Sequence, residues 1–192
     1  LLKKKTHFGQ DKQLLDTIHT LLDRVNRIDM ASQAHSFWYR HYYLMSKATL
    51  QYLLNDMAGA MQLLKTHFSN WKKQDKFVAT HGEFYIELLY MINYAGILYG
   101  EYDYVTAVFN DPLNKQITDP SHRAYFEVTR YLALNKIYNK TARYEEVKKL
   151  LVVMKANYTS WEPSLTDELN STLSFSMGVG CFALEQYEDA LF

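Results

Sequence analysis

The chain has 192 residues, of which 48% are hydrophobic and 15% aromatic, and its 21 basic and 21 acidic side chains give zero net charge. This composition excludes wholesale disorder, and the interspersed charges argue against a nucleic-acid binder, which concentrates Lys and Arg. No uncharged apolar stretch is long enough to span a membrane, so we expect no membrane association. The single cysteine, Cys181, lies in an apolar run and is expected to be buried. One cysteine also favours a reducing compartment, so we expect a cytoplasmic protein.

The spacing of apolar residues predicts helices almost throughout and no strands. In chain order, the predicted helices cover 13–27, about 32–54, 56–71, 84–99, 102–110, 120–139, 144–156 and about 163–184. Thr80 and Glu83 have the spacing of a capping box before the fourth helix. Asp119 followed by Pro120 is a helix start signal, and Pro163 opens the last helix. The fold class is therefore all-α.

A short turn-and-helix phrase recurs four times along the chain. The phrases occupy 55–60, 100–105, 142–147 and 185–190, and their last residues are 45, 42 and 43 residues apart. A fixed period of this size is typical of stacked-repeat proteins, in which each unit buries its apolar face against its neighbours. The sequence therefore predicts an α-solenoid of stacked antiparallel helix pairs.

We expect one helical-repeat domain, 1–192, with about four units. The opening helix, 10–29, would be the second helix of a preceding unit, and the units follow at roughly 32–73, 80–117, 119–157 and 164–192. The chain begins at Leu1 without Met and stops as a new helix begins, so we expect a fragment of a longer protein. Its cut ends should expose apolar surface, and self-association through them stays open.

The phrases resemble tetratricopeptide repeats, which carry an aromatic residue just after the turn and a small residue three positions later. The matching pairs are Tyr102 with Val105, Tyr144 with Val147, and Tyr187 with Ala190, while Met57 with Ala60 keeps only the small residue. The chain is similar to divergent bacterial members of this group with long helices. Its period exceeds the usual 34 residues, and Asn93 and Asn135 replace the small residue within the first helix. The resemblance implies a right-handed superhelix.

In such a stack the first helices of the pairs line a concave groove. The resemblance places eight side chains there, namely Tyr42, Thr49, Tyr52, Glu87, Tyr90, Tyr94, Thr129 and Lys136. Tyrosine offers a large, rigid and amphipathic surface at low entropic cost, which suits peptide capture. An aromatic stripe at helical spacing is also the ordinary pattern of a helix core, and this second interpretation stays open for each tyrosine.

Residues suited to catalysis or metal binding are sparse. His81 and Glu83 lack the cysteines of a zinc deaminase site, and His35 and His41 lie on opposite faces of their helix. Glu83 and Glu87 share a helix face, as acid–base pairs do, but capping and solvation explain them more simply. We therefore expect a non-enzymatic protein with no catalytic residues, no metal and no cofactor.

The leading hypothesis is a protein–protein interaction module or scaffold that binds a peptide or partner helix in the Tyr-rich groove. An alternative is a sensor or dimerisation domain of a larger bacterial regulator, whose DNA-binding or catalytic domain lies outside this sequence. A weaker third hypothesis is an enzyme with its site in the helical groove. Fold alone does not choose among them.

Overall fold

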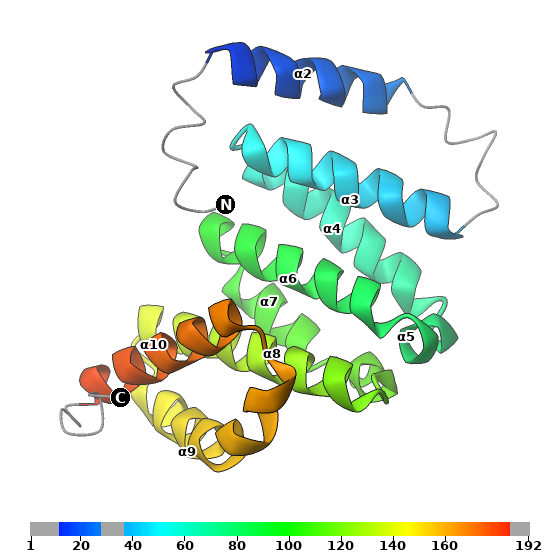
Figure 1. Cartoon of the computed structure of the whole chain (residues 1–192). Helices are drawn as coiled ribbons and strands as arrows, with labels where there is room; N and C mark the ends of the chain where they lie inside the picture. The colour runs from blue at the N-terminus through cyan, green and yellow to red at the C-terminus, as the bar shows by residue number, and fades with distance from the viewer. Residues whose placement is uncertain (1–11, 28–36, 185–192) are drawn as a thin grey trace. The chain divides into compact units, whose positions relative to one another are not determined.

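A computed structural model describes residues 12–27 and 37–184, and every regular element within these two stretches is helical (Figure 1). The prediction of an all-α protein is therefore confirmed. The elements are α2 (Lys12–Asn26), α3 (Phe37–Leu53), α4 (Met57–Lys72), α5 (Lys76–Thr80), α6 (Gly82–Tyr99), α7 (Tyr102–Phe109), the 3-10 helix η2 (Pro112–Gln116), α8 (Pro120–Lys140), α9 (Tyr144–Trp161), the 3-10 helix η3 (Glu162–Ser164) and α10 (Asp167–Ala183). His35 and the fourth phrase, 185–190, lie outside the described residues.

The chain divides into two compact units. Unit 1 comprises residues 1–75 and 87–101 and holds α2, α3, α4 and most of α6. Unit 2 comprises residues 76–86 and 102–192 and holds the start of α6 and the elements α5 and α7 to α10. The predicted repeat boundaries and the stacking of the helix pairs remain predictions.

Two predicted helix starts are placed differently by the structure. Thr80 is the last residue of α5, where its hydroxyl donates to the Phe77 carbonyl, so it does not cap α6. Pro163 belongs to η3, and α10 begins later, with the Thr166 hydroxyl accepting from the Leu169 N–H at 3.3 Å. The predicted start at Asp119 is confirmed, because its carboxylate accepts from the His122 N–H at 2.9 Å.

One helix also ends later in the structure than the sequence predicts. Helix α9 continues past Ala156 to Trp161, which is buried. The Trp161 ring packs on Tyr131 of α8 with the ring centroids 5.2 Å apart. Burial of two large rings stabilises these last turns of α9, which the local sequence pattern does not reveal.

The first residue of each described phrase has the same unusual backbone conformation. Asn55, Gly100 and Ala142 have positive φ angles of 66°, 86° and 55°. The residue after each one donates its N–H to a carbonyl five positions earlier, at 2.9, 2.8 and 2.9 Å respectively. This is the Schellman arrangement that ends a helix on a left-handed residue. The recurring sequence phrase therefore corresponds to a recurring turn.

This turn predicts opposite effects for two substitutions. Ala142→Gly should raise the free energy of unfolding by about 0.5–1 kcal/mol, because glycine adopts positive φ without strain. Gly100→Ala should lower it by about 1 kcal/mol. A Cβ at Gly100 would have no atom within 4 Å, so this loss is purely conformational. Urea unfolding followed by circular dichroism measures both changes.

The control for this prediction is Ala156→Gly, at an exposed position inside α9. The same chemical change should here lower stability by about 1 kcal/mol, because glycine weakens a helix interior. A stability loss at Ala142→Gly as well would show that its left-handed conformation carries no strain.

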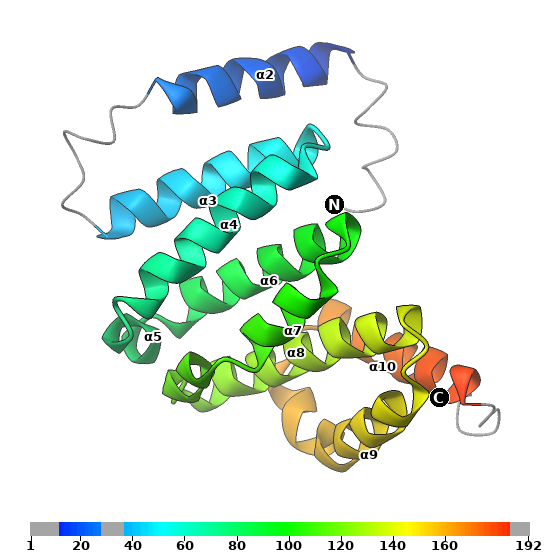
Figure 2. The ribbon, with the colours of Figure 1, turned by 180° about the vertical axis from the view of Figure 1, so that it is seen from behind.

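In unit 1, α3 and α4 form an antiparallel pair with α2 packed on α3 (Figure 2). Small residues lie where α3 and α4 approach, since Ala48 and Ala60 are completely buried. Trp71 near the end of α4 is also completely buried, with its ring in edge contact with Phe37 and Trp38. Small residues therefore pack between α3 and α4 toward one end of the pair, and aromatic rings pack between them at the other.

In unit 2, one hydrophobic cluster joins α8, α9 and α10. Gly180 of α10 lies against Leu151 of α9, because a Cβ at Gly180 would be 3.1 Å from both Leu151 methyl groups. Cys181 beside it is completely buried, as predicted from its apolar run. The Asn135 side chain of α8 donates to the Ser176 carbonyl of α10 at 2.9 Å and to its hydroxyl at 2.7 Å. This polar contact joins α8 to α10 beside the apolar cluster.

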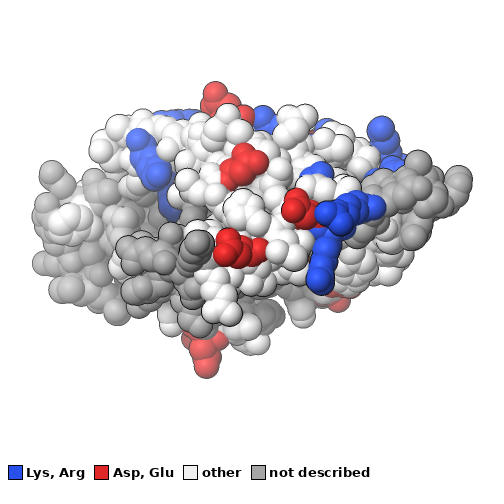
Figure 3. All heavy atoms as spheres, turned by 90° about the horizontal axis from the view of Figure 1, so that it is seen from above, with Lys and Arg blue, Asp and Glu red and all other residues white. Residues whose placement is uncertain are grey.

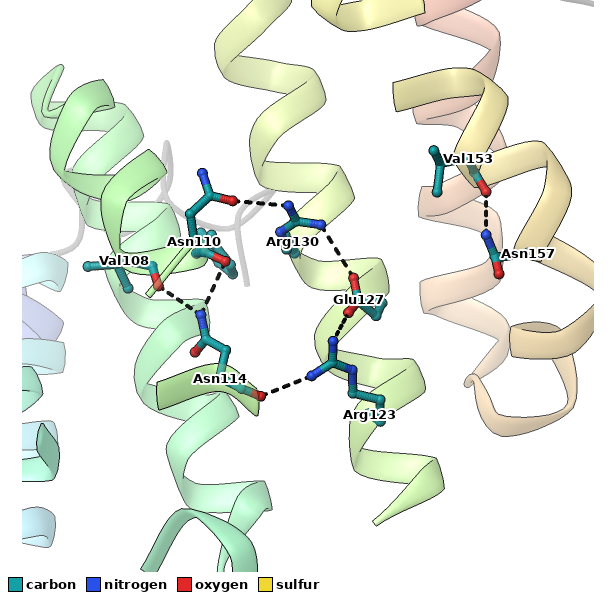
Figure 4. Close-up of polar contacts among 9 residues, drawn as sticks. Val108, Asn110, Asn114, Arg123, Glu127, Arg130, Val153 and Asn157 are labelled. Carbon is teal, nitrogen blue, oxygen red and sulfur yellow. Dashed lines mark hydrogen bonds and ion pairs between the residues drawn. The ribbon is translucent and has the colours of Figure 1, made fainter. Parts of the chain in front are cut away.

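A buried amide holds the connection between α7 and α8. The Asn114 side chain donates to the Val108 and Phe109 carbonyls at 2.9 and 3.1 Å, and its oxygen accepts from the Tyr85 hydroxyl at 2.8 Å. Its backbone carbonyl accepts from Arg123 of α8 at 3.0 Å (Figure 4). One asparagine thus links α6, α7, η2 and α8 within unit 2.

Candidate partner-binding surface

Three of the predicted groove tyrosines come together in unit 1. The hydroxyls of Tyr90 and Tyr94 on α6 lie 2.9 Å apart, and their ring centroids are separated by 4.6 Å. Burial and then the charge of Tyr94 raise the pKa of Tyr52 on α3. These rings are half-buried, so they present apolar faces and hydroxyl groups at the same place. We call Tyr52, Tyr90 and Tyr94 the tyrosine cluster.

The other predicted residues of unit 1 differ in what they offer. Tyr42 is 55% exposed, and Glu87 is exposed on α6. The Thr49 hydroxyl donates to the Met45 carbonyl of its own helix at 2.8 Å. Tyr42 and Glu87 therefore present accessible side chains, whereas the Thr49 hydroxyl already donates its hydrogen bond within α3.

The two predicted groove residues of unit 2, Thr129 and Lys136, differ in burial. Thr129 is only 1% exposed and its hydroxyl donates to the Tyr125 carbonyl at 2.9 Å. It offers no surface to a partner, so the expectation that Thr129 lines a groove is replaced by a role inside unit 2. Lys136 is exposed, and its pKa is lowered by partial burial and then by the neighbouring Lys140. Of these two residues, only Lys136 is accessible to a ligand.

A buried histidine pair in unit 1 was not predicted. The His67 Nε2 and His41 Nδ1 atoms lie 2.8 Å apart, and both residues are 1% exposed. The buried His67 Nδ1 atom has no hydrogen-bond partner among the described residues. An unmet acceptor is tolerated better than an unmet N–H, so we assign the shared proton to His67 Nε2, donating to His41. No sequence spacing signals this pair, whose members lie on different helices.

Some charged side chains of the described residues form ion pairs. Glu83 lies 3.7 Å from His122, and Lys65 lies 2.7 Å from Glu101. On the face shown in Figure 3, basic and acidic side chains are scattered among uncharged residues. Within residues 12–27 and 37–184, no group of three His, Cys, Asp or Glu side chains could hold a metal ion.

No protein-family model, curated protein or solved structure matches this chain. Over the stretches that the structure describes, no helix combines the length and apolarity of a membrane span. The functional proposal therefore depends on this chain's own residues and their geometry.

Proposed function

We propose that the chain is a non-enzymatic protein–protein interaction module, a divergent tetratricopeptide-like solenoid that binds a peptide or partner helix in the cytoplasm. The observation that carries this proposal is the tyrosine cluster, in which the half-buried Tyr90 and Tyr94 of α6 are joined through their hydroxyls and the half-buried Tyr52 of α3 has its pKa raised by burial and by Tyr94. Such rings contribute large contact area with little loss of side-chain entropy on binding. The repeated Schellman turns support the repeat architecture.

The cluster is built for contact rather than for chemistry. The Tyr90 and Tyr94 hydroxyls bond to each other. A tyrosine hydroxyl is neutral at pH 7, and burial raises the pKa of Tyr52 further above its ordinary value. A neutral phenol is a poor nucleophile and a poor base but a good hydrogen-bond partner for a peptide backbone. Exposed Glu87 and Tyr42 supply polar rim contacts of the kind that surround binding hot spots.

Peptides selected from a random library displayed on phage against the intact chain provide the test. The Tyr90→Ala/Tyr94→Ala variant should bind a selected peptide about tenfold or more weakly, because truncating a central aromatic pair removes well over 1 kcal/mol of binding energy. Fluorescence anisotropy of the labelled peptide measures the affinity.

The matched control is Tyr90→Phe/Tyr94→Phe, which keeps the rings and deletes only the hydroxyls. It should retain most of the affinity if ring contact dominates. Equal affinity of the alanine double variant and the original chain, with both shown to be folded by circular dichroism, would remove the tyrosine cluster from the binding site.

A further inference from the structure

A hydrogen bond between two buried histidines joins α3 to α4 in unit 1. The His41 Nδ1 and His67 Nε2 atoms lie 2.8 Å apart, and each residue is 1% exposed. The ring centroids of Trp38 and Trp71 each lie 5.9 Å from that of His41. We call His41 and His67 the histidine pair. Because one ring nitrogen must donate and the other must accept, this link between the helices requires an unprotonated acceptor.

A further proton on the histidine pair either breaks this bond or adds a donor that has no acceptor. Protonation of His41 Nδ1 removes the acceptor of the His67 Nε2–H. His67 Nδ1 is buried and has no hydrogen-bond partner among the described residues, so a proton there would be a buried N–H without an acceptor. In both cases a positive charge lies among apolar rings and away from water. The closed α3–α4 pair therefore disfavours protonation.

The described carboxylates of unit 1 do not compensate this cost. Burial lowers the pKa of both histidines, and the His41 charge lowers that of His67 further. The Tyr42 ring, 5.4 Å from the His41 ring between centroids, contributes a phenol rather than a carboxylate.

The other charged groups around the histidine pair do not favour a proton there either. Together with one more histidine, the charged side chains described on the helices of unit 1 are Asp16, His19, Asp23 and Arg24 of α2, Arg40 and Lys47 of α3, Lys65 and Lys72 of α4, and Glu87 of α6. The α2 groups, Lys72 and Glu87 are exposed, and Lys65 is paired with Glu101. The remaining two, Arg40 and Lys47, are cations, which repel a protonated histidine.

The histidines of unit 2 are not enclosed in this way. His81 and His122 are partly exposed. His122 also lies 3.7 Å from Glu83 and 3.8 Å from Asp119, so a proton on its ring lies beside two carboxylates rather than among apolar rings. The structural penalty for a proton is therefore found at the histidine pair of unit 1 and not at these two residues.

We propose that the histidine pair is an acid-sensitive switch within unit 1, which keeps α3 and α4 together at neutral pH and lets them separate in acid while unit 2 stays folded. In the separated helices both imidazoles meet water and take up protons, so acid stabilises the open state relative to the closed one. Opening exposes side chains that are otherwise completely buried, among them Ala48, Ala60 and Leu64. Such a switch does not depend on the proposed interaction function.

Hydrogen exchange of the intact chain, followed by mass spectrometry of its peptic fragments, tests this proposal. Protection is compared at pH 7 and 5 after correction for the intrinsic exchange rates. In α3 and α4 it should fall by about twentyfold for each histidine, and thus by roughly several hundredfold for the pair, because the open histidines have the ordinary pKa of 6.5. In α8 and α9 it should change by less than about threefold. An equal loss in all four helices would overturn the switch, and so would undiminished protection of α3 and α4.

Variants connect the effect to the histidine pair. His41→Gln/His67→Gln removes both titrating groups, so protection of α3 and α4 should then change by less than about threefold between pH 7 and 5. The matched control, His122→Gln, removes a partly exposed histidine of unit 2 and should keep the full loss in α3 and α4. If the double variant does not fold, His67→Gln alone should reduce that loss to about twentyfold. A folded variant of the pair that keeps the full loss would overturn the assignment.

Discussion

Lowering the pH from 7 to 5 should destabilise the folded chain through the buried histidine pair. Burial lowers the pKa of His41 to about 4, and burial together with the His41 charge lowers that of His67 to about 3. Both values lie below the unfolded value of 6.5, so the unfolded chain binds more protons between these limits. The free energy of unfolding is therefore highest above pH 6.5, where the histidines are neutral in both states. It falls as the pH drops below 6.5, by about 2 kcal/mol per histidine at pH 5.

The geometry explains why neither histidine accepts a proton readily. A proton added to His41 Nδ1 removes the acceptor of the 2.8 Å hydrogen bond. A proton added to His67 Nδ1 creates a buried N–H with no described partner. The surrounding rings of Trp38 and Trp71 offer little solvation to either cation.

Urea unfolding at a series of pH values measures this effect. The His41→Gln/His67→Gln variant keeps polar side chains that do not titrate, so its stability should change far less between pH 7 and 5. The matched control, His19→Gln, removes an exposed histidine and should keep the full pH dependence. If the His41→Gln/His67→Gln variant loses as much stability on acidification as the original chain, the histidine pair is not the source of the pH dependence.

Asn114→Ala should lower the free energy of unfolding by about 4 kcal/mol, because it leaves several buried polar groups without partners. The Tyr85 hydroxyl loses its acceptor, and the Val108 and Phe109 carbonyls lose a donor. Tyr85 is completely buried, so water cannot replace the lost bond without rearrangement. Thermal and urea unfolding measure the loss.

Two further variants separate the buried network from an exposed contact nearby, in which the Arg130 side chain of α8 donates to the Asn110 side-chain oxygen at 3.0 Å (Figure 4). Tyr85→Phe removes one hydroxyl and should lower stability by about 1–2 kcal/mol, with a coupling to Asn114→Ala that a double-mutant cycle detects. Asn110→Ala removes an exposed partner of Arg130 and should change stability by less than about 0.5 kcal/mol. Additive effects of Tyr85→Phe and Asn114→Ala would contradict direct coupling.

Part of the candidate surface was predictable from the repeat register. The resemblance to tetratricopeptide repeats predicts that Tyr90 and Tyr94 point the same way, and the structure joins their hydroxyls. Thr129 follows the exposed Glu87 by the repeat offset of 42 residues but is buried, because the register gives the direction of a side chain and not what covers it. On α10, Leu173 and Met177 are buried while Phe175 is exposed, and this difference depends on which face of the helix packs on α8 and α9.

The sequence by itself determined the long helices and the recurring turns, because these depend mostly on interactions a few residues apart. The start of α8 at Asp119 is such a local feature, and so is the turn at Gly100, where glycine adopts positive φ without strain. Only the tertiary structure decided that His41 meets His67 and that Asn114 meets Tyr85. These partners are 26 and 29 residues apart in sequence, and their contact depends on how whole helices pack.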